Sequence, residues 1–408
     1  MSPSPFDRFI EELRVTGPDA ALADLCQHFA RGERFPELFE MRKVQMRHRL
    51  GLPAGQWQSL EELPPALARR VEEGLLEICR ETGTLLLQSG QIAAGWSYLE
   101  PVGDRKLVRE LLSGIDPVPE RTDALIHLWI GQGIDPTRGF RLVLERYGTC
   151  SGITTYESQI ARFPPDVRRE VIGLLVEHVY QELSRNIDRS LADPASQETA
   201  EQKRIYPDGF VAESLNNNPG LTSGLGHHID ATHLITTVRY SAMLRDRRLQ
   251  RLAVELARYG ESLHADFQFP GSAPFEQTYR DVRSFLGALR GERTDEVVAA
   301  LRRRAGELAK DRRELDAAAW LVYLLDSLGR GSEALDAWFQ WLHQPASDST
   351  LNEDVSPSLA ELVDRYGLHE EAMKRLKESG DLAGFATVAV SGFQKSRATG
   401  SSGVIAAQ

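Results

Sequence analysis

The segment AWLVYLLDSLGRGSEALDAW (319–338) carries the clearest indication of the fold. Its apolar residues recur with the 3.6-residue period of an α-helix, and Gly329 interrupts them at a turn. The pattern predicts one helix over about 314–328 and a second over about 332–343. Two helices joined by so short a turn must run antiparallel, so the segment predicts a helical hairpin.

The same combination of helical period and turn glycine recurs along the chain, at Gly90, Gly133 and Gly367. The pattern over residues 6–150 predicts successive helical hairpins. A long helix is predicted after Pro164-Pro165. No stretch shows the alternation of a strand, so the predicted fold class is all-α, with antiparallel hairpins stacked as a solenoid. Further helices are predicted at about 230–247, 249–265, 275–290, 294–310, 356–366 and 369–379.

The C-terminal hairpins resemble tetratricopeptide repeats, mainly over residues 315–380. Gly329 and Gly367 stand 38 residues apart, against 34 in the family, and Val322 occupies a position where the family has Gly or Ala. The resemblance implies stacked hairpins whose concave face binds peptides or other proteins. The residues that match the family pattern are Leu321, Gly329, Glu333, Ala334 and Trp338, then Leu359, Ala360, Gly367, Glu371 and Ala372, with a poorer match at Gly83, Gly90 and Gly95.

Residues 188–229 lose the helical period and are rich in Asn, Gly and Pro. This change predicts an N-terminal hairpin region (1–187), a long central loop (188–229), a C-terminal repeat-like region (230–390) and a flexible tail (391–408). Phe210, Val211, Leu215, Leu221 and Leu225 give the loop apolar anchors, so we expect it to be ordered.

The composition is that of a globular protein, with 41% hydrophobic and 26% charged residues. A net charge of −11 argues against binding to nucleic acid or to an anionic membrane. The three widely spaced cysteines form no disulfide framework, and the N-terminus lacks the apolar core of a signal peptide. The longest apolar run is too short to cross a bilayer. These features predict a cytoplasmic protein.

The segment HHIDATH (227–233) gathers more potential acid/base and metal-binding groups than any other. Imidazole and carboxylate suit Zn²⁺, Fe²⁺ or Mn²⁺. If Asp230 caps a helix, His228 lies in the preceding turn and His233 on the first helical turn. The predicted catalytic residues are His228, Asp230 and His233. The predicted metal ligands are His228, Asp230, His233, His264 and Asp266.

A purely structural interpretation of the same residues is a capping motif, in which Asp230 accepts backbone N–H groups and the histidines fill polar gaps. Cys150 lies near a helix C-terminus, which does not favour an ionised thiol, so we expect a structural role for it. Tyr279 and Asp281, near a predicted helix start, are also expected to be structural.

Two hypotheses of function follow. The first is a helical-repeat binding or scaffolding protein with a protein or peptide partner. The second is a metal-assisted or general acid/base enzyme, a hydrolase or lyase, that uses the His/Asp site at 227–233 on a small-molecule substrate.

Overall fold

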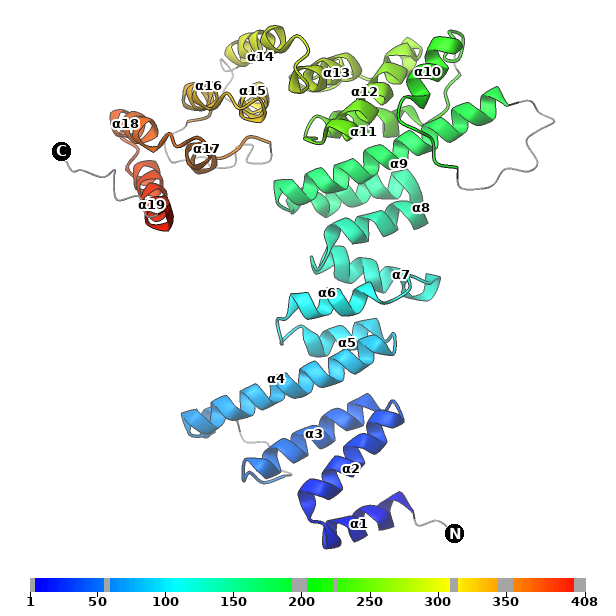
Figure 1. Cartoon of the computed structure of the whole chain (residues 1–408), viewed down its shortest axis with the longest axis vertical. Helices are drawn as coiled ribbons and strands as arrows, with labels where there is room; N and C mark the ends of the chain where they lie inside the picture. The colour runs from blue at the N-terminus through cyan, green and yellow to red at the C-terminus, as the bar shows by residue number, and fades with distance from the viewer. Residues whose placement is uncertain are drawn as a thin grey trace. The chain divides into compact units, whose positions relative to one another are not determined.

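The computed structural model describes residues 4–54, 59–192, 204–223, 226–308, 315–343 and 355–399. Within these ranges the secondary structure is entirely helical and contains no strand (Figure 1). The predicted all-α class is confirmed. Consecutive helices pack against one another along both halves of the chain.

The chain divides into two compact units, Met1–Leu142 and Val143–Gln408. The division falls inside helix α8 (Pro136–Ser158), which is kinked at Gly148. The boundary that the sequence predicts, after residue 187, lies instead within the second unit. The sequence signal at 188–229 is a change of composition, whereas the compact units follow from packing, and α9 packs with the helices that come after it.

In its described residues the first unit contains seven α-helices and the start of α8. Proline occupies the first turn of five of them, where its missing N–H group breaks no helical hydrogen bond. One apolar cluster joins α2, α3 and α4, and a second runs from α4 to α8. The helices are α1 (Pro5–Val15), α2 (Pro18–Arg31), α3 (Phe35–Arg49), α4 (Pro65–Gln88), α5 (Ile92–Leu99), α6 (Arg105–Ser113) and α7 (Pro119–Ile126), with a 3₁₀ turn at Leu60–Glu62 and a π-helical turn at His127–Gly131.

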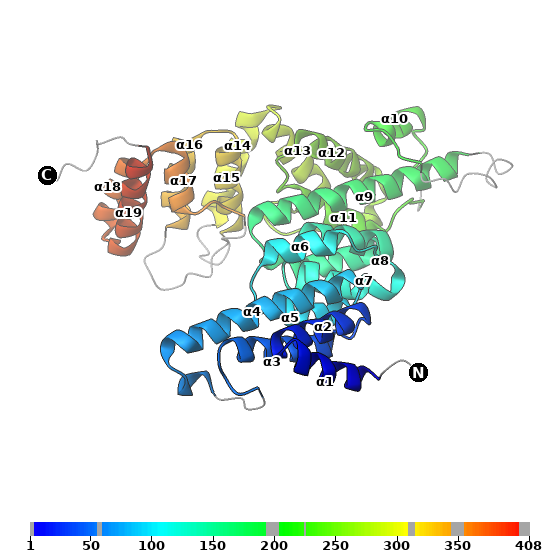
Figure 2. The same cartoon turned by 60° about the horizontal axis from the view of Figure 1, so that its bottom comes forward.

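The second unit contains the rest of α8 and, after it, the long helix α9, which packs against α11 and α12; α9 lies alongside α11 in Figures 1 and 2. Its helices are α9 (Pro165–Leu191), α10 (Phe210–Asn217), α11 (Ala231–Ser241), α12 (Arg247–Ser262), α13 (Thr278–Leu289), α14 (Thr294–Leu308), α15 (Asp316–Ser327), α16 (Gly331–Ala337), α17 (Leu359–Tyr366), α18 (His369–Ser379) and α19 (Leu382–Thr399), with 3₁₀ turns at Ile160–Arg162 and Ala265–Phe267 and a π-helical turn at Trp338–Leu342.

Helix α9 is buried on more than one face. Val171 and Leu175 are fully buried on one face, and Ile172 and Tyr180 are fully buried outside that face. The extra burial arises because α10, α11 and α12 all pack against this helix. A helix with neighbours on several sides therefore forms the core of this part of the unit.

The predicted central loop (188–229) contains more helix than expected. The last turn of α9 extends into it, and α10 lies within it. Residues 193–203 and 224–225 lie outside the described residues. The start of α10 is held by a residue far away in the sequence. Glu255 of α12 accepts hydrogen bonds from the backbone N–H groups of Gly209 (2.9 Å) and Ala212 (3.1 Å). Glu255 also accepts a hydrogen bond from the hydroxyl of buried Tyr180, at 3.0 Å.

Several residues that carry the repeat resemblance lie at helix ends or in the core of the C-terminal helices. Gly329 and Gly367 follow α15 and α17 with φ of 74° and 70°, a left-handed conformation that glycine adopts without the strain of a side chain. Ala334 and Ala372 are fully buried between helices. The predicted tail (391–408) begins inside α19, which continues to Thr399; residues 400–408 lie outside the described residues.

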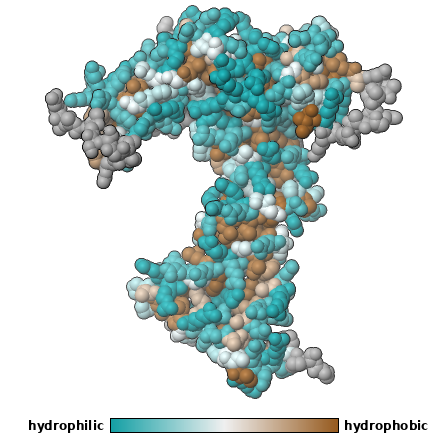
Figure 3. All heavy atoms as spheres, viewed as in Figure 1, coloured by the Kyte–Doolittle hydropathy of each residue, from teal (hydrophilic) through white to brown (hydrophobic). Residues whose placement is uncertain are grey.

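Polar side chains cover most of the face shown in Figure 3, with apolar residues scattered among them. Among the described helices, none is both long enough and apolar enough to cross a membrane.

Candidate functional site

The HHIDATH segment (227–233) forms the entry to α11, and Asp230 is the N-cap residue that the sequence predicts. Its carboxylate accepts hydrogen bonds from the backbone N–H groups of Thr232 (2.8 Å) and His233 (3.2 Å), and from the Thr232 hydroxyl (2.5 Å). These bonds lower the pKa of Asp230, and the bond from the Thr232 hydroxyl makes the largest contribution. The carboxylate thus accepts hydrogen bonds from backbone N–H groups in the first turn of α11, as the capping interpretation requires.

His228 is held by Tyr259, a fully buried residue of α12. The tyrosine hydroxyl accepts a hydrogen bond from the His228 backbone N–H at 2.9 Å and lies 2.9 Å from the ring atom Nδ1. Burial, with a smaller contribution from the neighbouring His227, lowers the pKa of His228, whereas burial raises the pKa of Tyr259 to about 12. Burial therefore favours the neutral form of both the His228 and the Tyr259 side chains.

His264 and Asp266 form a separate local arrangement on the 3₁₀ turn after α12. His264 is the N-cap residue of this turn, and its Nδ1 accepts the backbone N–H of Asp266 at 3.3 Å. The same nitrogen lies 3.3 Å from the Asp266 carboxylate. In the part of the chain that the structure describes, no hydrogen bond or ion pair joins these two residues to His228, Asp230 or His233.

The predicted metal centre is not assembled in the described residues. No three His, Cys, Asp or Glu side chains come together there as a metal-binding group, and this finding includes the five predicted ligands. The physical reason is local, because the Asp230 carboxylate is directed at the first turn of α11 and the His228 ring at Tyr259. A role for His228, Asp230 and His233 in general acid/base catalysis stays a prediction.

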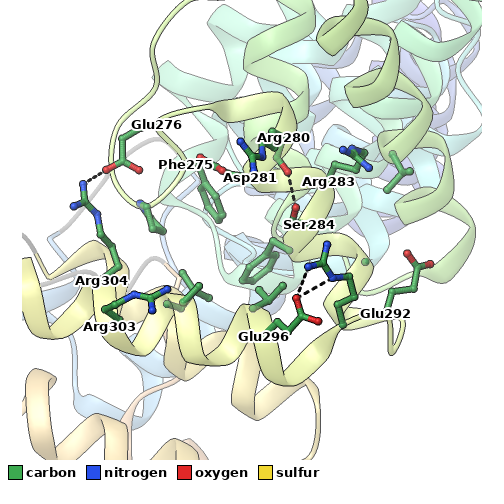
Figure 4. Close-up of a pocket in the computed structure, with 18 of the residues that line it drawn as sticks. Phe275, Glu276, Arg280, Asp281, Arg283, Ser284, Glu292, Glu296, Arg303 and Arg304 are labelled. Atoms are coloured by element: carbon green, nitrogen blue, oxygen red, sulfur yellow. Dashed lines mark hydrogen bonds and ion pairs between the residues drawn. The ribbon is translucent and has the colours of Figure 1, made fainter.

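A larger candidate site lies between α13 and α14, where the side chains line a groove of about 680 Å³ (Figure 4). Val254 of α12, Phe275 and Phe285 are almost fully buried and contribute apolar lining, together with Leu301 of α14. Charged side chains from both helices also line the groove. An apolar base with a polar rim is the usual arrangement of a ligand-binding cleft.

Arginine is the most frequent residue type around this groove. Figure 4 shows Arg280 and Arg283 of α13 on one side, and Arg303 and Arg304 of α14 on the other. The full set of arginines is Arg258, Arg280, Arg283, Arg290, Arg293, Arg303 and Arg304, and the carboxylates of the lining are Glu276, Asp281, Glu292, Glu296 and Glu307. The groove therefore offers hydrogen-bond donors and acceptors side by side.

Asp281 is a partly buried carboxylate of the groove, and burial raises its pKa. It accepts a hydrogen bond at 2.8 Å from the backbone N–H of Gln277, the residue that precedes α13. The sequence places it correctly near a helix start but gives no sign that it lines a groove, because α14 is separated from it by a turn of unremarkable composition.

No family model, curated protein or solved structure matches this chain. Any functional assignment must therefore come from the residues themselves.

Proposed function

We propose that this protein is a helical-repeat binding protein that holds an extended segment of a partner polypeptide in the groove between α13 and α14. The observation that carries the proposal is the groove itself, which combines an apolar base with donors and acceptors from facing helices. The resemblance of residues 315–380 to tetratricopeptide repeats supports the same class of partner.

The dimensions of the groove agree with such a ligand. Within α14 the lining extends from Glu296 to Glu307, which are eleven residues apart. At 1.5 Å per helical residue this corresponds to about 16 Å. An extended polypeptide advances about 3.3 Å per residue, so the groove accommodates about five residues of a partner chain.

The backbone of a bound peptide would find partners on both sides. Carboxylates such as that of Glu276 accept hydrogen bonds from peptide N–H groups, and arginine side chains donate to peptide carbonyls. We place the protein in the cytosol. The support is that Cys26, Cys79 and Cys150 are all free thiols in the structure, as a reducing compartment favours.

A selection from a library of random nine-residue peptides displayed on phage tests the proposal. We expect purified protein to enrich peptides whose affinity falls by about tenfold or more for Ala300→Trp, which places a large ring in the groove. The matched control is Gly306→Trp, on the same helix but outside the groove, where an added Cβ meets no atom within 4 Å. Failure to enrich any peptide over a blank support, or equal loss with both variants, would contradict the proposal.

A further inference from the structure

The charge of the groove is opposite in sign to that of the chain. Seven arginines and five carboxylates line it, an excess of two positive charges, whereas the whole chain carries a net charge of −11. The groove therefore carries a local excess of positive charge on an acidic protein. Such a local field attracts an acidic ligand and disfavours a basic one.

Four of the arginines are already paired with carboxylates. Arg283 lies 2.7 Å from Glu261, and Arg290 lies 2.6 Å from Glu292. Two further pairs are Arg293 with Glu296 and Arg304 with Glu276. These ion pairs hold the guanidinium groups at the rim, and the carboxylates neutralise much of their positive charge.

The other three arginines come from three different helices. Arg258 of α12 and Arg303 of α14 make no hydrogen bond or ion pair with the described residues, and both are exposed. Arg280 of α13 donates only to the side-chain oxygen of Gln277, at 3.3 Å. Three guanidinium groups around one groove are therefore available to a ligand.

We propose that the groove recognises an acidic segment of a partner protein, whose Asp or Glu side chains pair with Arg258, Arg280 and Arg303 while its apolar side chains contact Val297 and Ala300, the apolar lining residues of α14 that are not buried. This inference rests on the function proposed above and specifies the partner. Arginine pairs with carboxylates through two parallel N–H···O bonds, so each available guanidinium can direct one acidic side chain.

The lining favours a peptide over a single-stranded nucleic acid. The five carboxylates would repel a phosphodiester backbone, which has no N–H groups to satisfy them. Binding of unpaired bases usually relies on exposed aromatic side chains. Phe275 and Phe285, the aromatic residues of the groove, are only 5% and 1% exposed and offer no stacking surface.

Fluorescence anisotropy with defined probes tests the inference. The probes are three labelled nine-residue peptides, (Glu-Leu-Ser)₃, (Gln-Leu-Ser)₃ and (Lys-Leu-Ser)₃, and a twelve-residue oligothymidylate. At low salt we expect the Glu peptide to bind about tenfold more tightly than the Gln peptide, and the other two to bind more weakly still. Because exposed ion pairs are weak, Arg303→Gln and Arg258→Gln should each reduce the affinity for the Glu peptide about two- to threefold.

Arg302→Gln is the matched control. It removes the same charge from the adjacent position of α14, but Arg302 pairs with Glu333 and does not line the groove. Equal losses for Arg302→Gln and Arg303→Gln, tighter binding of the Gln or Lys peptide, or displacement of the Glu peptide by oligothymidylate would overturn the inference. If the phage selection yields groove-dependent peptides that are not acidic, the proposed function stands and this inference fails. If no peptide depends on the groove, both fail.

Discussion

Helix α13 has two sides with different surroundings. One side packs closely against α12, and the other side, which faces α14, lines a groove of about 680 Å³. The close approach occurs where the ring of Tyr279 lies against Gly260 of α12. A Cβ added to Gly260 would come within 2.3 Å of the ring. On the open side, the facing positions carry Arg280, Arg283, Arg303 and Arg304.

The comparison shows how one helix supports two different kinds of surface. Where a residue has no side chain, the neighbouring helix packs directly on the backbone and the interface excludes water. Where both helices carry long charged side chains, the cost of burying the charges keeps the guanidinium groups at the surface. The packed side thus holds α13 in position, and the charged side remains accessible to a partner.

The largest effect is expected at the packed side. Gly260→Ala should lower the free energy of unfolding by roughly 2–3 kcal/mol, because the new methyl group meets a buried aromatic ring. Gly306→Ala, at an exposed helical position with no neighbour, should raise it by about 0.5–1 kcal/mol through the higher helix propensity of alanine. Urea denaturation measures both. Stabilisation by both substitutions would show that α12 and α13 are not in close contact at this point.

An intermediate effect is expected from the two tyrosines near this interface. Tyr259→Phe should cost about 1–2 kcal/mol, because it leaves the His228 N–H group without its acceptor. Tyr279→Phe should be neutral or slightly stabilising, because the buried hydroxyl of Tyr279 has no hydrogen-bond partner among the described residues. Thermal denaturation of the two variants at pH 7 distinguishes them. Equal destabilisation would mean that the hydroxyl of Tyr279 is also bonded.

The smallest effect is expected at the open side, from Asp281→Asn. Because burial raises the folded-state pKa of Asp281, the stabilisation associated with this group is complete below the unfolded-state pKa. It is lost as the pH rises from about 4 through the folded-state value. The Asn variant should not lose this stabilisation as the pH rises. The difference between its melting temperature and that of the wild type should therefore shift by about 1–2 °C in favour of the variant between pH 3.5 and pH 7. Parallel profiles would indicate that the groove does not bury this carboxylate.

Local patterns predicted the features that depend on neighbouring residues in sequence. The helical class, the turn at Gly329 and the cap at Asp230 each follow from a few adjacent positions. The available arginines of the groove could not be predicted in this way. Arg258 and Arg303 each resemble an ordinary solvated position of a helix, and only the packing of α12, α13 and α14 places them around one groove.

The same limit applies to His228 and α10. The sequence presents His228 as a potential ligand, but its partner Tyr259 lies 31 residues away and has no motif to identify it. Glu255 stands between apolar residues of α12, and its partners lie 43 to 75 residues earlier in the chain. Contacts at such separations depend on the tertiary fold, so the sequence does not predict the helix α10 within the loop.

The contact between Glu255 and the start of α10 also has a consequence for how the protein is made. The ribosome synthesises Gly209 46 residues before Glu255, so α10 emerges before the carboxylate that satisfies its first N–H groups exists. An eight-residue helix without that support is only marginally stable in water. We therefore expect residues 210–217 to become stably helical only after α12 has been translated and has packed on α9, an order set by the position of one carboxylate.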